Sequence, residues 1–169
     1  MDVFNDTEQR SEAYRIMADF FISPPDPDML EPIRNDFQLE FSETAGEIAA
    51  EFSELLSYPQ GKLQPIASFF LGETSPGTGF YAKAGLEIDE DVELPPDHLY
   101  LELLFFSHLV ETGQVDLQKT FLGEHLMKWV PDFCDELHRT ARTAFYRSIA
   151  ILVREFLAAE YELYEDEVR

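Results

Sequence analysis

The sequence predicts an all-α fold, a single-domain helical bundle that spans residues 1–169. The chain is 45% apolar, which is enough to bury a core and argues against a disordered protein. Apolar residues recur at helical spacing through most of the chain, and no stretch alternates as a strand would. Residues 94–113 are apolar almost all round, which predicts a buried central helix.

The first 71 residues predict four helices. Residues 6–22 carry apolar side chains at helical spacing, and the Ser-Pro-Pro sequence that follows them ends this helix. Asp26 and Pro27 are typical of an N-cap and a first-turn proline, so a short helix is expected to begin there. A third helix is expected over residues 42–57 and a short fourth one over residues 63–71, with turn residues between them.

An irregular loop segment is expected at about residues 72–96. It contains the glycine-rich sequence GETSPGTG, one expected helical turn at residues 80–84, and a linker with five carboxylates over residues 86–94. Irregular segments beside a polar helix end often form binding surfaces, so this region is a candidate for function.

The central helix is expected to begin at two prolines. Pro95 and Pro96 preset the backbone dihedrals of a helix start. Asp97 then places a carboxylate in the first turn, where free N–H groups favour it, and Gly113 ends the helix.

Two further helices are expected after the central one. Asp116 caps the first, which reaches Trp129. Pro131 and Asp132 then interrupt the chain, and a long final helix follows from Phe133.

The charge balance is strongly acidic, with 34 Asp and Glu against 12 Lys and Arg, for a formal net charge of −22. Acidity of this degree either serves solubility alone or attracts a basic partner such as an arginine-bearing peptide. It repels phosphate backbones and anionic membrane surfaces, so no nucleic acid is expected as a partner.

The chain carries no sign of export or membrane insertion. No apolar run approaches the ~18 residues of a membrane span, and the N-terminus lacks the pattern of a signal peptide. A cytoplasmic protein is therefore expected. Cys134 is the single cysteine, which excludes an internal disulfide and a cysteine-based metal site and favours a packed thiol.

Asp97, His98 and Glu102 form a polar cluster at the start of the central helix. His98 and Glu102 are four residues apart and share a helix face, as metal-binding pairs do. A metal- or nucleotide-dependent hydrolase that uses this cluster is one alternative, although the sequence has no H-E-x-x-H signature. The other alternative is structural, with Asp97 capping the helix and His98 at the edge of the core. No metal and no cofactor is expected.

The sequence GETSPGTG has the glycine spacing of a phosphate-binding loop. Thr78 stands where that loop carries lysine, and an expected helix rather than a strand precedes it. A flexible turn is therefore the favoured interpretation.

Beyond these patterns, PPDHLYLELLFFSHL resembles the signature of the TorD/DmsD/NarJ group of redox-enzyme maturation chaperones. The downstream sequence FLGEHLMKWVPDFCDELHRTARTAFYRSIAILVREFL is similar to the rest of that family's pattern, and FYAKAGLEIDEDVELPPDH to its approach to the signature. The resemblance covers about residues 80–157. It implies an all-α chaperone of the TorD-like type, not an enzyme, that binds the twin-arginine signal peptide or an immature form of a molybdenum-cofactor oxidoreductase subunit. Such chaperones assist cofactor insertion and assembly before export.

The resemblance also implies a peptide-binding region. The Asp-His pair of the family's recognition region corresponds to Asp97 and His98, with Leu99 and Glu102 following them. The family's aromatic-leucine-phenylalanine stretch is matched in part by Phe69, Phe70, Leu71 and Gly72, but the proline-rich, acidic-aromatic tract expected after it is missing. The family implies a monomer or a domain-swapped dimer. A scaffold subunit that stays bound to its client is a third hypothesis, after the chaperone and the hydrolase.

Overall fold

The structure, a computed structural model, describes residues 7–73 and 77–167. Over these ranges it is helical, and the only strand-like pairing is an isolated bridge between Ile66 and His98. The all-α prediction is therefore confirmed. The helices are α1 (Thr7–Asp19), α2 (Leu30–Phe37), α3 (Ala45–Glu51), α4 (Ser68–Leu71), α5 (Gly79–Lys83), α6 (Leu99–Glu111), α7 (Val115–Phe121), α8 (Met127–Thr140) and α9 (Ala144–Glu167).

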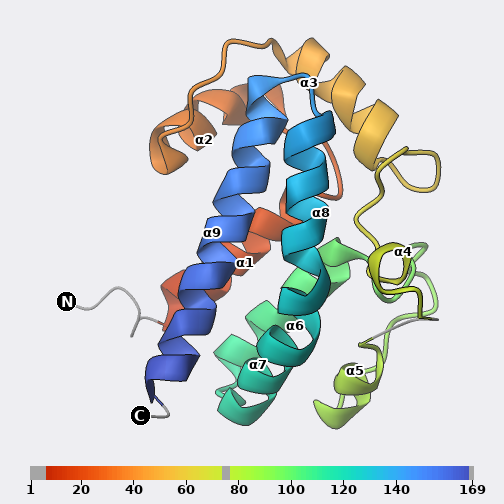
Figure 1. Cartoon of the computed structure of the whole chain (residues 1–169), viewed down its shortest axis with the longest axis vertical. Helices are drawn as coiled ribbons and strands as arrows, with labels where there is room; N and C mark the ends of the chain where they lie inside the picture. The colour runs from red at the N-terminus through yellow and green to blue at the C-terminus, as the bar shows by residue number, and fades with distance from the viewer. Residues whose placement is uncertain (1–6, 74–76, 168–169) are drawn as a thin grey trace.

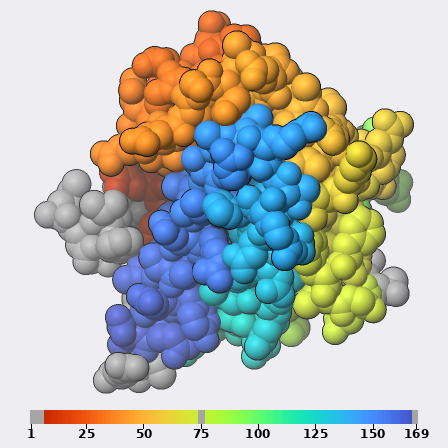
Figure 2. All heavy atoms as spheres, turned by 45° about the horizontal axis from the view of Figure 1, so that its top comes forward, coloured from red at the N-terminus to blue at the C-terminus, as the bar shows by residue number. Residues whose placement is uncertain are grey.

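Two helix pairs build the molecule. The helices α8 and α9 lie side by side and antiparallel along its long axis, and α1 packs along α6 behind them (Figure 1). The segment that contains α2 and α3 covers the end of the hairpin where α8 passes into α9, as the orange atoms in Figure 2 show. Helices α4 and α5 lie beside the lower half of α8 and α6.

The core is contiguous and rich in aromatic rings. Tyr14 of α1 stacks on Phe106 of α6 with ring centroids 4.4 Å apart, and Phe105 meets Phe121 at 5.0 Å. Leu99, Leu103, Phe106 and Leu109 of α6 are fully buried, so the prediction of a buried central helix is confirmed. Cys134 is buried as well, and this burial raises the pKa of its thiol to about 12, as expected of a packed thiol.

The central helix begins later than its two prolines predict. It starts at Leu99, and His98 is its N-cap, because the His98 Nδ1 atom accepts the Tyr100 N–H at 3.1 Å. Asp97 does not cap α6. Its carboxylate instead accepts the N–H of Ser68, the first residue of α4. The expectation that Asp97 lies in the first turn of α6 is therefore wrong.

The predicted interruption at Pro131 is also wrong, because α8 runs through this proline to Thr140. The missing N–H costs one hydrogen bond, while Trp129, Val130 and Phe133 on either side are fully buried and hold the helix in place. The chain breaks instead at residues 141–143, between α8 and α9.

Two carboxylates fix that break. Glu51 accepts the N–H groups of Arg142 and Thr143 at 2.8 and 3.0 Å, and the Thr143 hydroxyl at 2.6 Å. Glu43 accepts the N–H groups of Ala144 and Phe145, both at 3.0 Å. The free N–H groups at the start of α9 are thus satisfied by residues from the segment that leads into and forms α3.

Thr74, Ser75 and Pro76 of the GETSPGTG sequence lie outside the described residues. In the two ranges that are described, no helix is both long enough and apolar enough to cross a lipid bilayer.

Candidate functional site

The residues singled out by the sequence meet at a corner where residues 65–68 run alongside residues 97–99. Leu99 donates its N–H to the Pro65 carbonyl at 2.8 Å, and Ala67 donates to the Asp97 carbonyl at 3.1 Å. The Asp97 carboxylate accepts the Ser68 N–H at 2.8 Å. These three bonds attach the start of α4 to the start of α6, and we call residues 65–68 with residues 97–99 the corner.

Asp97 and His98 lie inside the corner rather than on the surface. Their exposed fractions are 2% and 1%. Burial lowers the pKa of His98 to about 4, and the negative charge of Asp97 offsets only part of this effect. A neutral imidazole suits its position, since Nδ1 must keep a lone pair to accept the Tyr100 N–H.

Glu102 is also buried, one turn along α6, and both of its oxygens are engaged. His125 Nε2 lies 2.6 Å from Oε2, and the Trp129 indole N–H donates to Oε1 at 3.0 Å. Burial raises the pKa of Glu102 to about 7, against the opposing effect of the His125 and Trp129 hydrogen bonds. Glu102 therefore joins α6 to the helical stretch that carries His125 and Trp129.

Gly77 closes this buried cluster from the loop side. Its φ angle is +79°, and a Cβ atom built on it would lie 2.6 Å from the His125 ring. Glycine is required there for close approach as well as for backbone conformation. His125 and Trp129 are four residues apart and share a helix face, but nothing in the sequence indicates that this face meets Glu102.

The four residues of the partial aromatic match have different environments. Phe69 of α4 is 66% exposed. Phe70 packs against Trp129 and Phe133, with ring centroids 5.8 Å from each, and Leu71 is half-buried. Gly72 ends α4 with a φ of +69°. The hydrogen bond between Asp97 and the Ser68 N–H brings residues 69–72 next to Asp97. Leu99, the other apolar residue of the predicted peptide site, is fully buried.

The cluster at the start of α6 does not assemble as a metal site. Asp97 binds α4, His98 caps α6 and Glu102 binds His125 and Trp129, so the three side chains serve three different partners. Across residues 7–73 and 77–167, no group of three or more His, Cys, Asp or Glu side chains is arranged to hold a metal ion.

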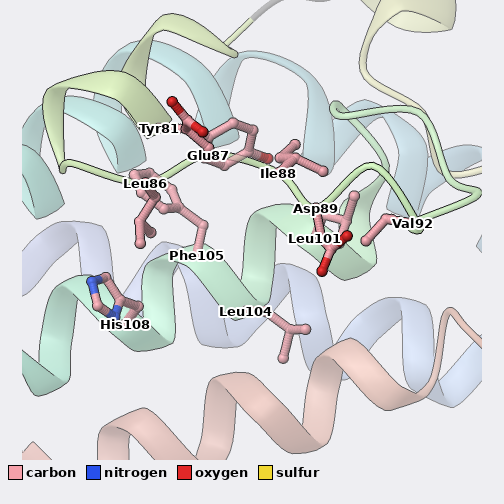
Figure 3. A pocket seen from close by; sticks show the side chains of 10 residues that line it. All are labelled: Tyr81, Leu86, Glu87, Ile88, Asp89, Val92, Leu101, Leu104, Phe105 and His108. Carbon is pink, nitrogen blue, oxygen red and sulfur yellow. The ribbon is translucent and has the colours of Figure 1, made fainter.

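A groove opens between α6 and the acidic linker. It is a cavity of about 260 Å³, and Figure 3 shows the linker running above α6 with side chains from both lining it. We call it the linker groove. Its lining residues are Tyr81, Leu86, Glu87, Ile88, Asp89, Val92, Leu101, Leu104, Phe105 and His108.

Comparison with curated proteins finds relatives that share one name, "Chaperone protein TorD". The chain is 29% identical to the one from Vibrio parahaemolyticus over 143 residues, which is 73% of this chain and 63% of the relative. It is 29% identical to the one from Pasteurella multocida over 124 residues, 68% of this chain and 62% of the relative. It is 31% identical to the one from Colwellia psychrerythraea over 85 residues, 50% of this chain and 36% of the relative. The chain thus spans less than two thirds of the length of these relatives.

A family model described as "Nitrate reductase delta subunit" matches residues 26–135. The matched range contains the corner, α4, α6, the linker groove and the Glu102 cluster. It also contains the PPDH sequence on which the resemblance to the TorD/DmsD/NarJ group rests. The chain belongs to the nitrate reductase delta subunit family, to which that group of maturation chaperones is assigned.

Proposed function

We propose that this chain is a chaperone for the maturation of a molybdenum-cofactor oxidoreductase. In this role it binds an immature subunit of the enzyme in the cytoplasm and assists cofactor insertion and assembly before export. The observation that carries the proposal is the family match over residues 26–135, together with relatives named as chaperones. The chaperone proposal replaces the hydrolase alternative, because a hydrolase site would need Asp97, His98 and Glu102 to face one substrate.

The twin-arginine signal peptide is the part of the client that we propose it binds. Such a peptide is basic and then apolar, and the net charge of −22 favours its approach. Arginine makes its strongest contacts as bidentate hydrogen bonds to carboxylates. Because Asp97 is buried and already bonded to Ser68, exposed carboxylates such as Glu73 are better placed to receive the arginines.

We place the apolar contact of this peptide at α4. Phe69 is 66% exposed, more than Met29, Tyr58, Val115 or Ile151, the other large exposed apolar side chains of the described residues. Asp97 fixes the first residue of α4, and Phe70 anchors the helix on Trp129 and Phe133. In this proposal Asp97 and His98 are positioning residues, with Leu99 and Glu102 forming the buried base beneath them.

Calorimetric titration with a synthetic twin-arginine leader peptide of a molybdenum-cofactor enzyme tests the proposal. Phe69→Ala is expected to weaken binding about tenfold, because an exposed aromatic anchor is lost. Val115→Ala is the matched control, since Val115 is 51% exposed on α7 and is expected to leave affinity unchanged.

Asp97→Asn tests the positioning role. The side chain keeps its size but binds the Ser68 N–H less strongly, so the leader is expected to bind more weakly while helical content measured by circular dichroism stays the same. Unchanged affinity in both Phe69→Ala and Asp97→Asn would remove α4 from the binding surface. No binding of leader or immature subunit to the wild-type chain would overturn the chaperone proposal itself.

A further inference from the structure

We propose that the linker groove is a second binding surface, separate from α4, which takes a short amphipathic peptide segment with large apolar side chains next to arginine or lysine. The inference rests on the proposed function only in assigning this segment to the client. Its chemical class follows from the groove itself.

The floor of the groove is one apolar stripe of α6. Leu101, Leu104, Phe105 and His108 are spaced as i, i+3, i+4 and i+7, which places them on one helix face. Another side of α6 packs against α1. Within the stripe, Phe105 is buried against Tyr81 of α5 and Phe121 of α7, and the linker runs above α6 at the groove (Figure 3). Leu101, Leu104 and His108 remain partly exposed, so apolar surface is left for a partner to cover.

The wall of the groove alternates between apolar and acidic residues. Leu86, Ile88 and Val92 are half-buried and line the cavity. The carboxylates between and after them are exposed: Glu87, Asp89, Glu90, Asp91 and Glu93. Residues 86–89 alternate in this way, and a turn follows in which Val92 donates its N–H to the Asp89 carbonyl at 3.0 Å. The groove thus has an apolar interior and an acidic rim.

The acidic rim and the apolar floor together determine which kind of partner the linker groove can bind. An acidic rim over an apolar floor complements a segment that carries both apolar and basic side chains. A second copy of this chain is disfavoured, because its own net charge is −22.

The groove is preformed, which lowers the entropy cost of binding. Helix α5, from which the wall continues, is anchored by Phe80 against Phe121 at 5.1 Å and by Tyr81 against Phe105 at 4.7 Å. The Tyr81 hydroxyl also donates to the Pro96 carbonyl at 2.7 Å, next to the corner. Both ends of the linker are therefore fixed to α6 or its approach.

Fluorescence anisotropy with a labelled synthetic amphipathic peptide, arginines on one face and leucines on the other, tests the inference. The double variant Glu87→Lys/Asp89→Lys is expected to weaken binding about tenfold or more, since charge-assisted contacts become repulsions. The double variant Asp36→Lys/Glu40→Lys is the control. It changes the net charge by the same amount at exposed sites outside the groove, and it is expected to weaken binding less than about threefold.

Ile88 tests the apolar contact. Ile88→Asn is expected to weaken binding about tenfold, and Ile88→Leu, which conserves volume, is expected to keep it. Equal losses in the two charge variants, or full binding by Ile88→Asn with native helical content, would overturn the inference. Self-association of the wild type in sedimentation experiments that Ile88→Asn abolishes would also overturn it, by showing that a second copy occupies the groove.

These results separate the inference from the proposed function. If the twin-arginine leader binds the wild type and Phe69→Ala abolishes this binding while the groove variants do not affect either peptide, the groove inference fails and the chaperone proposal stands. If no leader or immature subunit binds but the amphipathic peptide binds at the groove, the chaperone proposal fails and the groove inference stands.

Discussion

At position 98 an imidazole takes the N-cap place that serine, threonine, asparagine or aspartate usually fills. It functions there only while it is neutral, because a protonated Nδ1 cannot accept the Tyr100 N–H. The pKa of about 4 keeps it neutral in the folded protein at every pH above that value. In the unfolded chain, by contrast, histidine gains a proton below about pH 6.5.

The His98→Asn variant tests the consequence for stability. Because the folded pKa is lowered, the wild type loses stability as the pH falls from about 6.5 towards 4, by up to about 3 kcal/mol from this residue. Asparagine is a good N-cap that does not titrate, so the variant is expected to lose about 2 kcal/mol less than the wild type over that range. Urea unfolding at pH 7 and pH 4.5 measures the difference, and equal losses in the two proteins would contradict the assignment.

Gly77 and Gly72 form a natural pair for comparison. Both have positive φ angles, but a Cβ on Gly77 meets the His125 ring, whereas a Cβ on Gly72 meets nothing within 4 Å. Gly72→Ala is expected to cost about 1 kcal/mol from backbone strain alone. Gly77→Ala is expected to cost at least about 2 kcal/mol, since the loop must also move away from His125. Thermal unfolding of both variants measures the two losses of stability. Equal losses would show that the close approach of Gly77 to His125 does not contribute to the effect.

Sequence reasoning at this scale places Asp97, His98 and Glu102 close together along the chain but does not predict their burial. The spacing of His98 and Glu102 predicts a shared face at the start of α6. In the structure, however, residues 65–68 cover His98, and His125 and Trp129 cover Glu102. Local spacing carries no information about such long-range cover. For the same reason, Asp97 was expected to cap its own helix, while it caps α4, whose first residue lies 29 positions earlier.

Among the elements, the break between α8 and α9 depends on a distant carboxylate. Glu51 is 3% exposed and accepts hydrogen bonds from two backbone N–H groups and one hydroxyl at residues 142–143. Pro131, by contrast, is a strong local signal for a helix end but leaves α8 intact. The positions of helices could be predicted from apolar spacing, whereas this boundary could not, because the carboxylate that sets it lies about ninety residues away.

Glu51→Ala measures how much this break stabilises the fold. The variant leaves three donors without their acceptor, and the two on Thr143 are buried, so it is expected to cost about 3 kcal/mol or more. Glu54→Ala is the control, because Glu54 pairs with Arg142 and Lys62 at the surface and is expected to cost less than about 1 kcal/mol. Urea unfolding measures the free energy of unfolding of both variants. Similar losses in the two would show that the hydrogen bonds of Glu51 do not stabilise the break between α8 and α9.

At the scale of the whole molecule, most carboxylates of the described residues lie at the surface, whereas a few, among them Glu51, Asp97 and Glu102, are buried. Arginine side chains such as Arg10, Arg15 and Arg154 are already paired with carboxylates within the fold. The remaining acidic residues repel one another and attract cationic partners. Added salt is therefore expected to act in opposite directions on folding and on binding.

Raising the salt concentration from about 0.02 to 0.3 M is expected to increase the melting temperature, because it screens this self-repulsion. The same change is expected to slow association of the twin-arginine leader severalfold in stopped-flow measurements. A leader with both arginines replaced by glutamine is the control, and its association rate should respond little to salt. A leader rate that is independent of salt would show that long-range charge plays no part in encounter.

The burial of Cys134 has a practical consequence for all of these measurements. Burial keeps the Cys134 thiol protonated at neutral pH, and the side chain is 1% exposed, so maleimides and spin labels have almost nothing native to react with. A cysteine introduced at the surface, in α4 or along the acidic rim, becomes the sole labelling position without any need to remove the natural one. The burial of Cys134 thus lets a single introduced thiol report on α4 or on the linker groove without a background signal.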